Sequence, residues 1–193
     1  MIRLSANVLT SAIALLKRLD TYHFLSLSEL SYSKIASISA EDIFLFSKNC
    51  GWVSETESTL SITQRGNGLL RLQNQGLLSD LKRQMLMDCV LKVAPIWSNR
   101  ISYGRIEATI FMTKDEKACF LETGLLSERL DSSIINWWNT IASQIRMLTQ
   151  YAKTDIGRIG ERNSIKYEKN VQIPSLNGCL LTVIWQDMIL NQD

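Results

Sequence analysis

The sequence has little histidine, proline and cysteine, and it has no long apolar run. Its 193 residues include one His, two Pro, nine Gly and four Cys. A single histidine and cysteines that never form a CxxC pair argue against a zinc site. So few prolines and glycines leave little room for a flexible linker. No stretch approaches the roughly 18–20 apolar residues that span a bilayer, so we expect no membrane partner.

The composition that remains is that of a globular protein. Hydrophobic residues make up 46% of the chain, and 21 Lys and Arg stand against 19 Asp and Glu. This balance excludes a disordered tail and a strongly basic nucleic-acid coat. The four cysteines are widely scattered, which is typical of reduced thiols, mostly buried, in a cytoplasmic protein; they are Cys50, Cys89, Cys119 and Cys179.

The first 76 residues alternate between helical and extended patterns. Apolar residues at helical spacing predict an amphipathic helix over Leu4–Arg18, in place of a signal peptide. The Ser-rich segment Leu25–Leu30 is a strand or a turn, and Ser31–Ala36 is predicted to be a short helix. A further helix is expected over Ala40–Cys50, ending at Gly51.

Cap and turn residues define the rest of this first part. Ser39 precedes the Ala40–Cys50 helix as a predicted N-cap, with two acids in the first helical turn. The short segments 52–54 and 59–62 flank a polar turn, which indicates a β-hairpin. Thr63–Gly66 then starts another helix. This order over residues 39–72 resembles the winged-helix fold of bacterial regulators.

The winged-helix resemblance implies that the Ala40–Cys50 helix enters the major groove of DNA. Two acids, Glu41 and Asp42, stand at the end of this helix that approaches phosphates. DNA affinity depends mainly on phosphate neutralisation, so DNA binding and protein–protein contact both stay open. The candidate nucleic-acid-binding residues on and around this helix are Lys34, Ser47, Lys48, Asn49 and Arg65.

The second part, residues 77–170, is predicted to be mostly helical. Ser79 and Asp80 are expected to cap a helix that Pro95 ends, and shorter helices are expected over 100–112 and 115–122. A longer helix follows from Asp131 to Leu148, and a last one from Thr154 to Lys169. Three tryptophans could stack on bases; they are Trp97, Trp137 and Trp138. The apolar residues at helical spacing around the Trp137–Trp138 pair favour a core role instead.

The last predicted helix carries the most specific motif. It contains Gly-x-x-Gly-Glu, an apolar position and Tyr-Glu; these positions are Gly157, Gly160, Glu161, Ile165, Tyr167 and Glu168. This pattern resembles the entry helix of the domain named after the C-terminus of the plant protein NO VEIN, found in bacterial restriction and phage-defence proteins. The resemblance implies a nuclease-like domain, whose Asp and Glu-x-Lys residues would bind Mg²⁺. The sequence after Lys169 contains no Glu-x-Lys pair and the likeness to the family ends there, which leaves Glu161 and Glu168 as weak catalytic candidates.

Residues from about 170 onward suggest an altered reading frame. Shifting the frame by one nucleotide across Leu176–Leu190 permits codons for a stretch that resembles the first strands of the same family, including its candidate metal-binding Asp. We therefore hypothesise an out-of-frame tail on a truncated family member. The alternative is that Leu180–Trp185 is a genuine β-strand. The nucleotide sequence of this part of the gene distinguishes the two.

Together these patterns predict a mainly α protein with a small β-hairpin. The expected parts are a winged-helix domain (1–76), a helical domain (77–170) and an atypical tail (171–193). The expected function is a non-catalytic DNA-binding or adaptor protein of a bacterial restriction or anti-phage system. The alternatives are a Mg²⁺-dependent restriction-endonuclease-like nuclease and a protein-docking subunit of a multi-protein defence complex. Expected partners are double-stranded DNA or other defence-system subunits, self-association stays open, and no cofactor or metal is expected unless the nuclease alternative holds.

Overall fold

A computed structural model of the chain describes residues 2–22, 25–26, 34–35, 38–57, 59–129 and 131–170. Within these residues the protein is mainly helical, with two small antiparallel hairpins, so the predicted mainly α character is confirmed. The chain divides into two compact units, Met1–Met147 (the N-terminal unit) and Leu148–Asp193 (the C-terminal unit). The proposed out-of-frame tail, its alternative strand over 180–185 and His23 lie outside the described residues.

Helix α1 (Ala6–Tyr22) confirms the predicted amphipathic pattern, starting slightly later and ending later than expected. The Ser5 hydroxyl accepts a hydrogen bond from the Val8 N–H at 3.3 Å, which satisfies one free donor at the start of the helix. Its apolar face packs against helix α3 (Ala40–Asn49). The buried side chains of α1 are Val8, Leu9, Ser11, Ala12, Leu15, Leu16 and Leu19.

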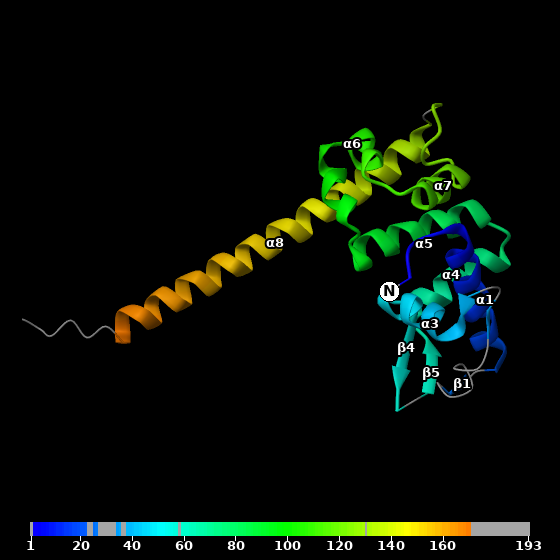
Figure 1. Ribbon diagram of the computed structural model, residues 1–193, viewed down its shortest axis with the longest axis horizontal. Helices are drawn as coiled ribbons and strands as arrows, with labels where there is room; N and C mark the ends of the chain where they lie inside the picture. Colours follow the sequence, from blue (N-terminus) through cyan, green and yellow to red (C-terminus); the bar gives the residue numbers. More distant parts are fainter. Residues whose placement is uncertain are drawn as a thin grey trace, which may run out of the picture. The chain divides into compact units, whose positions relative to one another are not determined.

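Short strands form two antiparallel sheets. Strands β1 (Leu25–Ser26), β5 (Thr59–Ile62) and β4 (Val53–Thr56) lie in that order, and β4 and β5 are the predicted hairpin (Figure 1). Strands β2 (Lys34–Ile35) and β3 (Ile38–Ser39) form the second sheet.

The helix predicted over 31–36 is wrong where the structure describes this segment. Ile35 lies opposite Ile38 in the β2–β3 pair and is buried, so pairing and burial of β-branched side chains override the weak local helical pattern. The Ser11 hydroxyl of α1 donates to the Ile35 carbonyl at 3.3 Å, which ties the strand to the first helix. Residues 31–33 and 36 of this predicted helix lie outside the described residues.

Helix α3 begins as predicted and ends one residue earlier, at Asn49, but the Ser39 side chain makes no capping hydrogen bond. Its C-terminus is followed by Gly51, whose φ of 78° lies in the left-handed region that favours glycine. Helix α4 (Gln64–Asn74) has a true side-chain cap, because the Thr63 hydroxyl accepts from the Gly66 N–H at 3.1 Å and donates to the Gly51 carbonyl at 2.7 Å. This hydroxyl joins the start of α4 to the end of α3.

Helix α5 (Leu78–Val93) starts two residues earlier than a cap at Ser79 predicts. Ser79 and Asp80 therefore lie in its first turn, and the cap position is Leu77, which makes no side-chain capping bond. The cap predicted at Ser79 and Asp80 is therefore wrong. Asp80 still stabilises the start of the helix, because the helix dipole favours an acid in the first turn. In Figure 1, α5 runs across the middle of the N-terminal unit, between α3 and α4 and the later helices α6 and α7.

The helix predicted over 100–112 is two elements. A 3₁₀ helix η1 (Ile96–Tyr103) precedes helix α6 (Arg105–Ile110), and Gly104 between them has φ of 119°. That backbone conformation cannot continue a right-handed helix, so the chain breaks at Gly104. Helix α7 (Lys114–Glu122) confirms the next prediction and begins with a capping box between Thr113 and Glu116.

Helix α8 (Ser132–Asn170) is a single helix of 39 residues, whereas two helices were predicted. The predicted break between residues 148 and 154 is wrong, because the intervening residues include no glycine or proline to end a helix. Asp131 precedes α8, and its carboxylate accepts hydrogen bonds from the Ser133 hydroxyl at 2.6 Å and the Ile134 N–H at 2.9 Å.

The core of the N-terminal unit is one continuous apolar cluster that runs from Leu4 to Ile145. Phe120 lies at its aromatic centre, 5.6 Å from the rings of both Trp97 and Trp138 and 5.8 Å from that of Trp137. The three tryptophans are buried, as predicted. The predicted domain boundary near residue 76 falls between α4 and α5, which pack against each other inside this unit.

Candidate functional site

The surface of α3 was predicted to contact DNA, and the structure sorts its residues into two faces. Its inner face contains buried side chains, among them Ile43, Phe44 and Phe46. Ser47 belongs to this inner face: it is fully buried, and its hydroxyl has no hydrogen-bond partner among the described residues. Ser47 therefore cannot reach a ligand from the exposed side. The exposed side chains of α3 are Glu41, Asp42, Leu45, Lys48 and Asn49.

Lys48 is already engaged within the protein. Its ammonium lies 2.8 Å from the carboxylate of Glu55 on β4, and it also lies 5.7 Å from the centre of the Phe44 ring. The ion pair connects the end of α3 to the β4–β5 hairpin. A phosphate group would have to compete with Glu55 for this cation.

Arg65 also forms an ion pair within the protein, and it makes more hydrogen bonds to its partner than Lys48 does. Its guanidinium donates through Nε and Nη2 to the carboxylate of Asp88 on α5, with Nε 3.0 Å from Oδ1 and 2.9 Å from Oδ2. Asp88 is 4% exposed, and it also accepts from Trp52 Nε1 at 2.8 Å and from Gln84 Nε2 at 3.1 Å. The hydrogen bonds that Arg65 donates to Asp88 raise the pKa of Arg65 above its ordinary value, although partial burial opposes this.

Sequence reasoning missed Asp88, although a signal was present. Asp88 follows Met85 by three residues and directly precedes Cys89, so it lies beside the apolar stripe of α5. A carboxylate at such a position needs partners when it is buried, and Trp52 and Arg65 supply them. The pattern thus indicated a buried acid, but it could not indicate which residues would pair with it.

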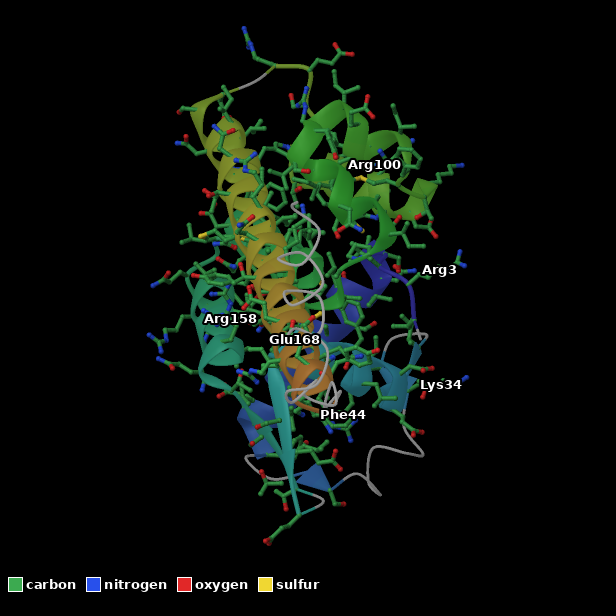
Figure 2. All side chains as sticks on the ribbon, turned by 90° about the vertical axis from the view of Figure 1, so that its left-hand side faces the viewer. Arg3, Lys34, Phe44, Arg100, Arg158 and Glu168 are labelled. Carbon is green, nitrogen blue, oxygen red and sulfur yellow. The ribbon has the colours of Figure 1, made fainter. Side chains whose placement is uncertain are left out.

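The remaining charges on the exposed α3 face and the neighbouring hairpin are mostly acidic. Glu41 and Asp42 lie in the first turn of α3, and Glu57 is exposed at the β4–β5 turn. We call the set Glu41, Asp42, Leu45, Lys48, Asn49 and Glu55 the α3–β4 surface. Lys34, from the neighbouring β2, is exposed, and its side chain points away from the ribbon (Figure 2).

The two weak catalytic candidates stand on the C-terminal part of α8. Glu161 and Glu168 are both exposed. Among the described residues, no three His, Cys, Asp or Glu side chains gather as ligands of a metal ion. The arrangement around these glutamates is therefore that of solvated charges on a helix.

Comparisons with protein-family models, with curated proteins and with solved structures found no match. In the part of the chain that the structure describes, no helix combines the length and the apolar character needed to cross a membrane. The function is therefore inferred from the site itself.

Proposed function

We propose that this chain is a non-catalytic adaptor whose N-terminal part is a winged-helix module that docks onto a protein. The β1–β5–β4 order, with α3 packed before the β4–β5 hairpin, supports the winged-helix assignment. In such a module α3 is the recognition helix. The α3–β4 surface is the proposed docking site.

One observation carries the choice of protein over DNA. Two of the three predicted DNA-binding cations, Lys48 and Arg65, are each paired with a carboxylate of the same chain. Binding of duplex DNA depends on cations that are free to neutralise phosphates. Glu41 and Asp42 add further negative charge to the face that would meet them.

The charges of the α3–β4 surface indicate which side chains a partner surface must carry. A matching surface carries basic side chains for Glu41 and Asp42, together with an apolar hollow for Leu45, which is 48% exposed. The resemblance of the Gly157–Glu168 motif to defence proteins supports a cytoplasmic partner among the subunits of a bacterial restriction or anti-phage complex.

DNA binding is the second candidate, favoured by one specific feature. A polar hollow of about 420 Å³ lies along α4, lined by Gln64, Arg65, Gly68 and Arg71. Arg71 contributes a second guanidinium near Arg65. Under this reading Arg71 and the exposed Lys34 contact phosphates beside the hairpin.

Photo-crosslinking in cells of the native host tests the docking proposal. A photoreactive amino acid at Leu45 is expected to form one protein adduct, which is lost when Glu41→Lys and Asp42→Lys reverse the local charge. The same probe at Ile106, 71% exposed on α6, is the matched control and is expected not to form that adduct.

Fluorescence anisotropy with a labelled duplex, with and without Mg²⁺, tests the alternatives. We expect no saturable binding at about 0.15 M salt. Salt-sensitive binding that is lost in Arg71→Ala would overturn the docking proposal in favour of DNA. Metal-dependent cutting that is lost in Glu161→Ala would show that the chain is a nuclease.

A further inference from the structure

Two buried thiols from distant parts of the sequence lie in contact. Cys50 directly follows α3 and Cys89 lies on α5, and their sulfur atoms are 3.3 Å apart. Both side chains are almost fully buried, and both cysteines are free. A disulfide requires the two sulfurs to approach to about 2.05 Å, so the contact brings them near enough for a small side-chain movement to join them.

One of the two thiols also borders a cavity. A hollow of about 470 Å³ lies between the N-terminal segment, α3, the end of α5 and the start of α7. Its walls are mainly apolar, and Cys89 is part of them whereas Cys50 is not. The main apolar lining residues are Ile2, Leu4, Phe46, Trp97 and Phe111.

We propose that Cys89 and Cys50 form a dithiol modification site, oxidised to a disulfide by a small apolar hydroperoxide that enters this cavity. The apolar walls select the reagent, because they offer little to solvate a charged oxidant. Cys89 reacts first because it borders the cavity, and Cys50 resolves the product because its sulfur is in contact. This site is independent of the docking proposal.

The reaction balances in two steps. Cys89 sulfur attacks the outer oxygen of the hydroperoxide, breaking the O–O bond and leaving a sulfenic acid on Cys89 and the corresponding alcohol. Cys50 sulfur then attacks the Cys89 sulfur and displaces the hydroxyl as water. The two thiols are oxidised by two electrons, and the hydroperoxide is reduced by two.

Burial controls the rate of the first step. Desolvation raises the pKa of the Cys89 thiol well above its ordinary value, and the contact with Cys50 and the charge of Asp88 add to this. The thiol is therefore protonated at neutral pH, and little thiolate is available. Oxidation is expected to accelerate as the pH rises.

The first test uses the full chain and cumene hydroperoxide as the probe. Peptide mapping after oxidation and alkylation is expected to show a Cys50–Cys89 disulfide, with Cys119 still a free thiol. Cys119 is the matched control, because it is just as buried in the same core but does not border the cavity. Equal oxidation of Cys119, or a disulfide that forms only in urea, would overturn the proposal.

The second test uses single variants and dimedone, which traps sulfenic acids. Cys50→Ser is expected to accumulate a dimedone adduct on Cys89, because the resolving thiol is gone. Cys89→Ser is expected to give no adduct on Cys50, since Cys50 does not border the cavity. Equal adducts in the two variants would refute the assigned order, and no adduct in Cys50→Ser would refute the site.

Discussion

The two ends of α8 have the same kind of apolar pattern, but its side chains are buried at one end and exposed at the other. In the N-terminal unit, Ile134, Ile141 and Ile145 recur at spacings of about two turns and one turn, and all three are buried. In the C-terminal unit, Ile156 and Ile159 continue the pattern, but they are 69% and 56% exposed. Helical periodicity therefore predicts the helix in both units and predicts burial in only one.

Neighbouring side chains account for the difference. The first part of α8 packs against other elements of its unit: Trp137 Nε1 donates to the Arg83 carbonyl at 3.1 Å, and Trp138 Nε1 donates to the Leu125 carbonyl at 2.9 Å. Residues 148–168 are all exposed. Most helical stability in proteins comes from packing of an apolar face, so the two parts should respond very differently to the same substitution.

The largest contrast is expected from one substitution made in both parts. Ile141→Ala removes a fully buried side chain, which should lower the free energy of unfolding by about 2–5 kcal/mol. Ile159→Ala, its matched control on the same helix, should change it by no more than about 0.5 kcal/mol. Urea unfolding followed by circular dichroism measures both values. A loss of similar size in the two variants would mean that Ile159 is covered in solution.

Removing a carboxylate should likewise destabilise the N-terminal unit much more than the C-terminal unit. Asp88→Ala leaves the Trp52 N–H buried without its acceptor and frees the half-exposed Arg65, at a cost of about 2–3 kcal/mol. Asp155 in the C-terminal unit lies 4.0 Å from Arg158, and both side chains are well exposed. Asp155→Ala should therefore have almost no effect. Unfolding curves in urea compare the two, and equal losses would contradict this assignment.

Alanine substitutions at two glycines, Gly66 in the N-terminal unit and Gly157 in the C-terminal unit, should have opposite effects on stability. A Cβ at Gly66 would meet the Trp52 carbonyl oxygen and come within 2.7 Å of the Ile62 side chain, so Gly66→Ala should cost about 1–3 kcal/mol. Gly157 lies on α8 with nothing near its Cβ position. Gly157→Ala should instead increase helicity, with a local gain of up to about 1 kcal/mol. Thermal melting and helical circular dichroism measure the two effects, and a stabilised Gly66→Ala would contradict the close approach.

The smallest expected effect concerns the start of α8. Hydrogen bonds from Ser133 and from the Ile134 backbone lower the pKa of Asp131 below its ordinary 3.8. The ionised Asp131 carboxylate therefore stabilises the fold at pH values above its ordinary pKa of 3.8. This contribution disappears as the pH falls through the lowered pKa of the folded state. The difference in melting temperature between the natural chain and Asp131→Ala should shrink in acid. When both chains also carry Ser133→Ala, this difference in melting temperature should be smaller. A difference that does not change with pH would exclude Asp131 as a cap.

Much of the helical framework could be predicted because local signals agree with tertiary packing. The Thr63 cap and the left-handed Gly51 mark the ends of two helices correctly. The β2 strand was missed because it depends on Ile35 pairing with Ile38 and packing near Ser11 of α1. Such contacts leave no periodic pattern in two residues.

The candidate site was less predictable, since it depends on contacts between distant residues. Lys48 was identified as an exposed cation, but its pairing with Glu55 needs the geometry of the hairpin. Ser47 was placed on the wrong face because the orientation of α3 is decided by what it packs against. Single-residue patterns identify charged groups, and only the fold decides which of them are free.

The Asp88 network has a consequence for how this chain can change during evolution. Trp52 and Arg65 come from the first 76 residues, whereas Asp88 and Gln84 come from the region that follows. A recombination event that replaced only one of these regions would separate the carboxylate from its donors. The two regions are therefore expected to be inherited together, or to lose the acid, the indole and the guanidinium in the same step.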